Sequence, residues 1–206
     1  MRVCFIGDSF VNGVGDAEGL GWRGRVTAAA LKTGLDVTAY DLGIRRNTSG
    51  DIRARWEAET AARLPAGLPH RLLFAFGTND CADDGTGRRR MGLADSVANA
   101  EAILDKARRQ APTLMIGPPP ILDDGEADAR IAELDKELGA LCAGLDVPFL
   151  PVLGLLRQHE AWTRGARRGD GTHPDAEGYA LLAREILAWP AFRSWIGLNP
   201  LQGNQR

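Results

Sequence analysis

The sequence predicts an α/β fold in which one parallel sheet carries helices on both faces. Short apolar runs, rich in β-branched or aromatic residues, alternate along the chain with longer amphipathic segments, and this alternation is typical of such a fold. The predicted strands are Arg2–Ile6, Val37–Leu42, Leu72–Phe76, Leu114–Ile116 and Phe149–Val152. A chain of 206 residues with 44% hydrophobic and 25% charged residues suits one globular domain. We therefore expect a single domain over residues 1–206, with a loose polar tail at 198–206.

Three segments outside these strands have helical patterns. Apolar residues recur at steps of three and four at Ile131, Leu134, Leu138, Leu141 and Leu145, and again at Tyr179, Leu182, Ile186 and Trp189. Such stripes form the buried face of a helix, and Pro190 ends the second one. Residues 51–64 carry Arg53/Glu57 and Arg55/Glu59 pairs after Thr48 and Ser49, which predicts an N-capped surface helix with a solvated charged face.

Composition and charge exclude several classes of protein. The net charge of -2 and the pI near 5.9 disfavour a nucleic-acid-binding domain, which is normally basic. No apolar run reaches the length of a membrane span, and no secretory signal precedes the first strand, so we expect a cytoplasmic protein. The three cysteines, Cys4, Cys81 and Cys142, include no CxxC pair, and the chain has no cluster with metal-ligand spacing. We interpret Cys81, beside Asp80, as a packing residue rather than a thiol nucleophile.

A candidate nucleophile follows the first predicted strand. The chain runs from that strand into Gly7-Asp8-Ser9, and ligands of open parallel sheets bind outside the carboxyl ends of the strands. A serine nucleophile needs a base and a group that orients the base, and Asp170-Gly171-Thr172-His173 supplies both in a glycine-rich loop closed by Pro174. The other two histidines fit less well: His70 begins the third strand, and His159 lies in a polar loop with only Glu160 nearby.

Acyl transfer also needs hydrogen-bond donors for the oxyanion that develops on the carbonyl oxygen. Gly43 follows the second strand, where its missing side chain lets the backbone N–H approach a substrate. Asn79, in Gly77-Thr78-Asn79-Asp80 after the third strand, offers a side-chain amide. Each of these residues alone is also compatible with an ordinary turn.

Taken in order, Gly7-Asp8-Ser9, Gly43, Gly77-x-Asn79-Asp80 and Asp170-x-x-His173 resemble the four blocks of the SGNH hydrolases, the GDSL esterase/lipase family. The resemblance implies a three-layer α/β/α sandwich of flavodoxin-like type with a five-stranded parallel sheet. It also implies that Ser9 is the nucleophile, His173 the general base and Asp170 its orienting residue. Ser9 and Gly43 would supply backbone oxyanion donors, and Asn79 a side-chain donor. No cofactor is implied.

The chain departs from the family pattern at two places. Phe10 replaces the leucine of the name motif, which we interpret as a packing change. Arg45-Arg46 follows Gly43 where relatives often have small residues, so substrate inference from relatives does not transfer directly. Trp22 matches an aromatic residue often found after the first loop, and it is a candidate both for the acyl pocket and for the core.

Three groups of arginines fall in loops at the expected catalytic edge of the sheet. They are Arg45 and Arg46, Arg88, Arg89 and Arg90, and Arg164, Arg167 and Arg168. One hypothesis is a positively charged rim that selects anionic ester substrates; the other is that these are solvated charges balanced by Asp83, Asp84 and Glu160.

These observations predict a serine esterase that cleaves small-molecule carboxylic esters through an acyl-enzyme. A thioesterase or a carbohydrate O-deacetylase would use the same residues, and a non-catalytic binding module is the alternative from another class. The GxSxG elbow of α/β-hydrolases is absent, as are the glycine-rich phosphate loops of nucleotide-binding folds. The first loop also lacks the hydroxyl side chains that an FMN site would need.

Overall fold

The computed structural model describes residues 1–198 and has the predicted three-layer α/β/α architecture. Five parallel strands form one sheet in the order β2-β1-β3-β4-β5. The strands are β1 (Arg2–Gly7), β2 (Thr38–Gly43), β3 (His70–Ala75), β4 (Thr113–Ile116) and β5 (Phe149–Leu150). All five predicted strands are present, although β3 begins at His70 rather than Leu72 and β5 ends at Leu150 rather than Val152.

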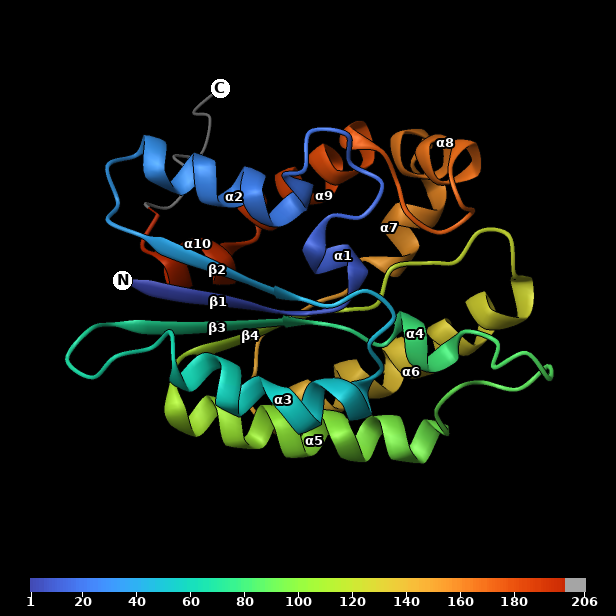
Figure 1. Cartoon of the computed structure of the whole chain (residues 1–206), viewed down its shortest axis with the longest axis horizontal. Helices are drawn as coiled ribbons and strands as arrows, with labels where there is room; N and C mark the ends of the chain where they lie inside the picture. Colours follow the sequence, from blue (N-terminus) through green and yellow to red (C-terminus); the bar gives the residue numbers. More distant parts are fainter. Residues whose placement is uncertain (199–206) are drawn as a thin grey trace, which may run out of the picture.

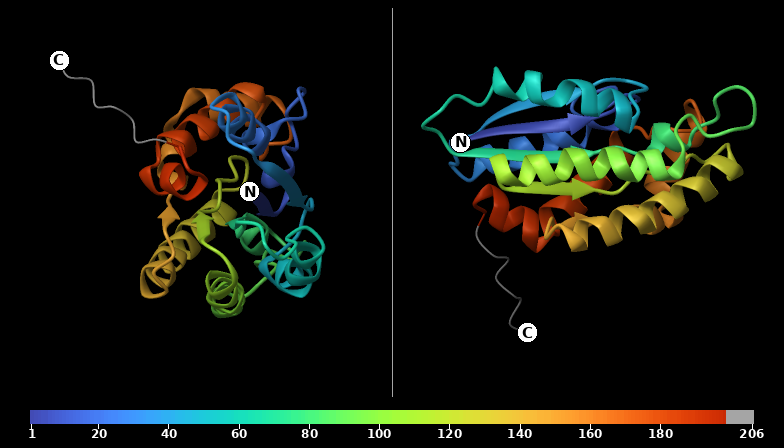
Figure 2. Two further views of the ribbon diagram at one scale, coloured as in Figure 1. Left: turned by 90° about the vertical axis from the view of Figure 1, so that its left-hand side faces the viewer. Right: turned by 90° about the horizontal axis from the view of Figure 1, so that it is seen from below.

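Helices cover both faces of this sheet (Figure 1). On one side lie α1 (Ser9–Asn12), α2 (Gly21–Lys32), α7 (Leu153–Gln158), α8 (Glu160–Arg168), α9 (Ala176–Ala188) and α10 (Pro190–Ile196). On the other side lie α3 (Ser49–Ala61), α4 (Thr78–Cys81), α5 (Leu93–Gln110) and α6 (Gly125–Gly144). The end-on view in Figure 2 shows the strands between these two helical layers. None of the helices within residues 1–198 has the length and hydropathy needed to span a bilayer.

The alternation of side chains along the central strands divides the interior into two apolar clusters. In β1, Val3 and Phe5 point to the layer of α2 and α9, whereas Cys4 and Ile6 point to the layer of α3, α5 and α6. Because β1 is buried on both faces, its sequence is a continuous apolar run and does not alternate between apolar and polar residues. The sheet is therefore packed on both faces beneath the loops at its carboxyl ends.

The helical stripes predicted from periodicity are confirmed. Ile131, Leu134 and Leu138 are buried in α6, while Leu141 and Leu145 are only partly buried near its C-terminal end. In α9 the stripe is buried up to Ile186, and Pro190 then opens α10. The expected tail at 198–206 lies outside the described residues except for Leu198, which packs against the apolar cluster.

The strand order explains where a ligand can bind. Strand β1 pairs with β2 on one side and with β3 on the other. The connection after β1 therefore runs to one side of it, and the connection after β2 crosses back to the other side. This reversal opens a crevice at the carboxyl ends of the strands. The turns that follow β1, β2 and β3 meet there, and these turns carry Ser9, Arg46 and Asn79.

Candidate active site

Ser9 begins the short helix α1 directly after β1, in a turn that depends on a glycine. A β-carbon on Gly7 would lie 2.0 Å from the carbonyl oxygen of Ala75 in β3, so no larger residue fits at the end of β1. Asp8 then caps α1 by accepting a 3.0 Å hydrogen bond from the N–H of Phe10. The turn is therefore anchored to the sheet, and it holds Ser9 2% exposed at the crevice.

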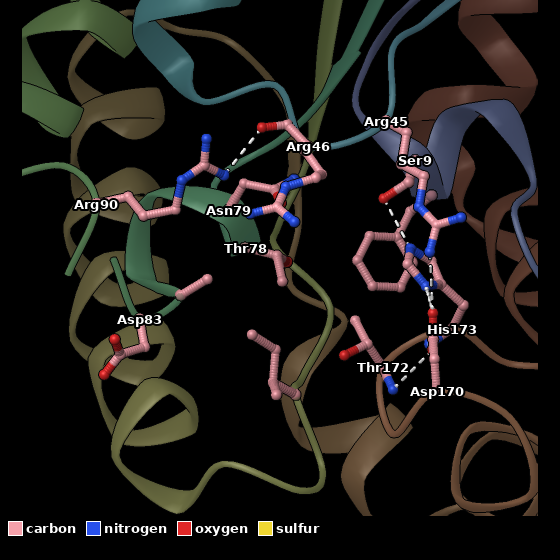
Figure 3. A pocket seen from close by; sticks show the side chains of 13 residues that line it. Ser9, Arg45, Arg46, Thr78, Asn79, Asp83, Arg90, Asp170, Thr172 and His173 are labelled. Carbon is pink, nitrogen blue, oxygen red and sulfur yellow. Dashed lines mark hydrogen bonds and ion pairs between the residues drawn. The ribbon is translucent and has the colours of Figure 1, made fainter. Parts of the chain in front are cut away.

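Ser9, His173 and Asp170 form one hydrogen-bonded chain, although Ser9 and His173 are 164 positions apart in the sequence. Oγ of Ser9 lies 2.7 Å from Nε2 of His173. Nδ1 of the same ring lies 2.7 Å from Oδ2 of Asp170. Figure 3 shows the three side chains next to one another on one side of the pocket.

The loop that presents His173 is organised by Asp170. Oδ1 of Asp170 accepts hydrogen bonds from the N–H groups of Thr172, at 3.1 Å, and His173, at 2.8 Å. Gly171 turns the chain with φ of 79°, a conformation that favours glycine. Asp170 thus shapes the loop with one oxygen and orients the imidazole with the other.

The charge states of this pair suit base catalysis. Burial lowers the pKa of His173 below its ordinary value of 6.5, against the opposing influence of Asp170. Burial tends to raise the pKa of Asp170, but hydrogen bonds from the backbone and ring of His173 outweigh it, and the net pKa is lowered. At neutral pH the imidazole is therefore uncharged. Its Nδ1–H donates to Asp170, which leaves Nε2 to accept the hydroxyl proton of Ser9.

Asn79 lies on the opposite side of Ser9, held by a buried carboxyl group. Its Nδ2 donates a 3.1 Å hydrogen bond to Oδ2 of Asp8, which leaves the second amide N–H for the pocket that Asn79 lines. Asp8 is 1% exposed, and burial raises its pKa to about 7. The preceding turn depends on Gly77, with φ of 125°, and on Thr78, whose hydroxyl donates to the Pro119 carbonyl at 2.8 Å.

Gly43, expected from the sequence to be an oxyanion donor, makes a different contact in the structure. Its N–H donates a 2.9 Å hydrogen bond to Oδ1 of Asp41, and Gly43 does not line the pocket. A β-carbon there would lie 2.4 Å from the backbone nitrogen of Asn12, so the glycine allows β2 and α1 to approach each other. Arg46 lines the pocket instead, and no hydrogen bond within residues 1–198 occupies its N–H.

The pocket around Ser9 has a volume of about 410 Å³. Its wall includes the Ser9–His173–Asp170 chain, Asn79, and three arginines, Arg45, Arg46 and Arg90 (Figure 3). Phe10 also lines it, with its ring centroid 4.9 Å from that of His173. The packing change expected at Phe10 therefore lies in contact with the ring of His173.

Trp22 does not take part in this pocket. The side chain is 1% exposed and packs edge-on against Phe5, with ring centroids 5.5 Å apart. Between its two candidate roles, the structure assigns Trp22 to the core, because the start of α2 faces the sheet and not the crevice.

The arginine rim is smaller than the sequence suggests. Arg45, Arg46 and Arg90 line the pocket, and Arg168 lines an adjacent hollow that shares Arg45, Asp170 and His173. Arg89 instead pairs with Glu133 at 2.7 Å, and Arg164 pairs with Glu160 and Glu177. Arg89 and Arg164 are therefore balanced by neighbouring acids, in line with the alternative hypothesis. Of the three acids it named, only Glu160 forms an ion pair with one of these arginines within residues 1–198, and Arg164 lies in α8 rather than in a loop.

Sequence reasoning missed the role of Arg55. The Arg55/Glu59 pair was expected on a solvated face, but the Arg55 side chain is only 15% exposed. It donates to the carbonyl oxygen of Gly7 at 2.8 Å and to Oδ1 of Asn47 at 2.7 Å. Arg55 thereby joins the turn that carries Ser9 to the loop that carries Arg46. No signal in the sequence distinguishes it from a surface arginine.

The remaining candidates lie elsewhere or are inert. His70 binds the Pro65 carbonyl at 2.7 Å, and His159 caps α8 through the N–H of Ala161 at 3.2 Å. Burial raises the pKa of Cys81 to about 12, which removes it as a thiolate nucleophile. Residues 1–198 contain no group of acids, histidines and cysteines arranged for a metal ion.

Known structures with the same architecture cover nearly the whole chain. The lipase/acylhydrolase from Enterococcus faecalis aligns with a TM-score of 0.77 and 22% identity, over 98% of this chain and 99% of that one. An acetylxylan esterase from Geobacillus stearothermophilus aligns with a TM-score of 0.74 and 19% identity, over 98% and 97% of the two chains. A lipolytic G-D-S-L family member from Veillonella parvula DSM 2008 has a TM-score of 0.69 and 18% identity, over 91% and 96%. A comparison with curated proteins gives no match.

The sequence also matches a family model directly. The model of the GDSL-like lipase/acylhydrolase family aligns with residues 5–181, a range that includes the Gly7-Asp8-Ser9 turn and the Asp170–His173 loop. The resemblance seen in the four short blocks is confirmed by this match over most of the chain. The protein therefore belongs to the GDSL-like lipase/acylhydrolase family of hydrolases.

Proposed function

We propose that this protein is a serine esterase that hydrolyses small-molecule carboxylic esters through an acyl-enzyme intermediate. Ser9 is the nucleophile, His173 the general base, and Asp170 the residue that orients His173. The observation that carries the proposal is the continuous hydrogen-bonded chain from Ser9 through His173 to Asp170, with 2.7 Å at both links. A nucleophile within hydrogen-bond reach of a base, itself oriented by a third group, defines this chemistry.

In the acylation half, Oγ of Ser9 attacks the ester carbonyl carbon while Nε2 of His173 takes the hydroxyl proton. The tetrahedral intermediate then collapses, the carbon–oxygen bond to the alcohol breaks, and Nε2 returns its proton to the leaving oxygen. In the deacylation half, a water molecule gives a proton to Nε2 and attacks the acyl carbon. When the second intermediate collapses, the bond between the acyl carbon and Oγ of Ser9 breaks and Nε2 returns its proton to Oγ. This releases the carboxylic acid and restores the Ser9 hydroxyl and the neutral imidazole.

The oxyanion of each intermediate needs donors on the side of the pocket away from His173. The Ser9 N–H has no hydrogen-bond partner within the described chain, and Asn79 has one amide hydrogen beyond that bound to Asp8. We assign the third donor to the Arg46 N–H in place of Gly43. This assignment is supported by the free N–H of Arg46 and its place on the pocket wall. Loss of one such donor typically costs 10²- to 10³-fold in kcat.

A serine-directed fluorophosphonate tests the nucleophile directly. Intact mass analysis of the wild type should show a single adduct, and peptide mapping should place it on Ser9. The Ser9→Ala variant should show none. Ser194→Ala is the matched control because Ser194 is exposed in α10, outside the pocket, and this variant should label like the wild type. An unlabelled wild type would favour a non-catalytic binding module, and an adduct that survives Ser9→Ala would mean that another residue is the nucleophile.

A substrate panel then separates the ester class from its alternatives. Simple alkyl and aryl esters should be hydrolysed, and Ser9→Ala should lose on the order of 10⁴-fold or more in kcat. Acyl-CoA thioesters test the thioesterase alternative. Acetylated xylo-oligosaccharides test the O-deacetylase alternative, which is the activity named for the similar structure from Geobacillus stearothermophilus.

A further inference from the structure

We propose that the pocket selects esters whose acyl half ends in a carboxylate, that is, monoesters of dicarboxylic acids, and that the Arg46 guanidinium binds this carboxylate with help from Arg90. The inference rests on the proposed function, because it names the substrate class of the same pocket. Of the arginine rim suggested by the sequence, the inference uses only Arg46 and Arg90.

Arg46 has an unpaired guanidinium group and a left-handed backbone conformation. Its guanidinium forms no ion pair or hydrogen bond within residues 1–198, yet the residue lines the pocket. Its φ is 69°, in the left-handed region that is strained for a residue other than glycine. A glycine would be more stable at this position, so the fold tolerates strain to keep a long cationic side chain beside Ser9.

Arg90 brings a second guanidinium to the same wall. Its Nη1 donates a 2.9 Å hydrogen bond to the carbonyl oxygen of Arg46, and this contact holds the two residues together. The side chains of Arg46 and Arg90 lie on the Asn79 side of the pocket in Figure 3. Planar guanidinium groups match the geometry of a carboxylate and can bind it through paired hydrogen bonds.

The nearby acids do not neutralise this wall by direct pairing. Asp83 lines the pocket, but its Oδ1 accepts the N–H groups of Gly85 and Gly87 in its own loop. Figure 3 shows its carboxylate turned away from both guanidinium groups. Asp51 and Asp80 interact electrostatically with Arg90. Their carboxylates, however, accept hydrogen bonds from the N–H groups of Thr48 and Ser49 respectively.

The position of the base decides which half of the ester carries the anion. His173 returns a proton to the leaving alcohol, so the alcohol must lie beside its ring. That side of the pocket holds Arg45, whose guanidinium is already 3.3 Å from Asp170. The acyl half then extends the other way, along the wall of Asn79, Arg46 and Arg90 (Figure 3). A carboxylate at the end of a short acyl chain would meet the unpaired guanidinium there.

The test compares two esters of equal chain length, ethyl hydrogen adipate and ethyl hexanoate, by the ratio of their kcat/KM values. Ethyl esters are chosen because aryl monoesters of short dicarboxylic acids cleave themselves through cyclic anhydrides. We expect the wild type to favour the adipate about 10-fold or more at low salt, and the preference should fall as ionic strength rises from about 0.05 to 0.5 M. A third ester, carboxymethyl hexanoate, puts the carboxylate on the alcohol half and should gain no such preference.

Two variants at Arg46 and one control make the test specific. Arg46→Gly removes the guanidinium, keeps the N–H and suits the left-handed backbone, so it should fold. It should reduce the adipate-to-hexanoate ratio about 10- to 100-fold, the scale of a hydrogen bond to a charged group. Arg46→Lys should retain part of the ratio. Arg88→Gly removes the same charge from an exposed position in the loop of Arg90, outside the pocket, and should leave the ratio unchanged.

The outcomes separate this inference from the proposed function. Equal kcat/KM values for adipate and hexanoate, or a ratio that Arg46→Gly does not change, overturn the inference while hexanoate hydrolysis still supports the esterase. A preference for carboxymethyl hexanoate that Arg46→Gly abolishes overturns the assignment to the acyl half. Failure to hydrolyse any of the three esters, together with an unlabelled Ser9, removes the proposed function and this inference with it.

Discussion

Asp8 and Asn79 lie 71 positions apart in the sequence, and Nδ2 of Asn79 donates a 3.1 Å hydrogen bond to the buried carboxyl of Asp8. The contact joins the turn after β1 to the turn after β3, so the nucleophile and the amide on the oxyanion side share one support. Asp8 is 1% exposed, and its pKa is raised to about 7 by burial. Burial therefore disfavours the ionised form of Asp8 in the folded protein.

Asp8→Asn should change how stability depends on pH. Because the folded-state pKa of Asp8, about 7, is above its ordinary value of 3.8, folding favours the protonated carboxyl. The stabilisation that this provides is complete below pH 3.8 and is lost as the pH rises through about 7. Asparagine keeps the helix cap and does not titrate. Urea unfolding at several pH values should show the variant gaining stability relative to the wild type across this window; parallel curves would contradict the raised pKa.

The pH dependence of kcat/KM should reflect His173. Its pKa is lowered from 6.5, mainly by burial, so the base is neutral and active through the neutral range. Activity should rise through an apparent pKa below 6.5 and then stay level toward neutral pH. Rates measured from pH 4.5 to 8 on a neutral ester test this, with a thermal unfolding series over the same range as the control for denaturation. An acid limb centred above 6.5 would point to another base.

Asp170→Asn should remove catalysis while leaving the fold in place. An asparagine can still support the loop, but it no longer fixes the imidazole with Nδ1 protonated, and the corresponding change in a Ser-His-Asp enzyme lowers kcat about 10⁴-fold. Steady-state kinetics and fluorophosphonate labelling rates should fall together. Asp175→Asn is the matched control, because Asp175 caps α9 from the same loop and asparagine caps equally well. Comparable activity in the two variants would sink the role assigned to Asp170.

Arg55→Ala should destabilise the nucleophile turn from a distance. The variant loses the hydrogen bonds to the Gly7 carbonyl and the Asn47 side chain, which we expect to cost about 1–3 kcal/mol in unfolding free energy. The control, Glu59→Gln, removes only the ion-pair partner of Arg55 on the helix surface, a loss of about 0–1 kcal/mol. Denaturant unfolding of both proteins measures the difference. Equal losses would mean that Arg55 acts through Glu59 and not through the turn.

Local patterns were sufficient for most of the fold. The apolar run of β1 and the stripe of α9 end where predicted because burial on both faces of a strand, or on one face of a helix, dictates residue type at each position. The break between α9, which ends at Ala188, and α10, which begins at Pro190, is also a local property, since proline lacks the N–H that would continue the helix. Strand ends were less accurate, as at β3, where pairing with β1 extends the strand back to His70.

The errors came where a distant segment decides what a residue does. Gly43 and Arg46 follow the same strand, and only the approach of α1 shows that the glycine serves packing and the arginine faces the pocket. Arg55 was expected on a solvated face, but α3 places it beneath the Gly7 turn. For Trp22 the sequence left the core and the acyl pocket open, and only the packing of α2 on the sheet decides for the core. The neighbouring residues in the sequence do not indicate whether these side chains lie in the core or at the pocket.

The parallel sheet, its helices and the residues able to support acyl transfer could be predicted from the sequence, because hydrophobic periodicity and turn chemistry are properties of neighbouring residues in one chain. The tertiary structure alone decided that Ser9 and His173 meet at 2.7 Å, that Asp8 supports Asn79, and that Arg46 keeps an unpaired charge at the pocket. The physical reason is that hydrogen bonds and ion pairs depend on distances of a few ångströms, which the strand order sets between segments far apart in the chain.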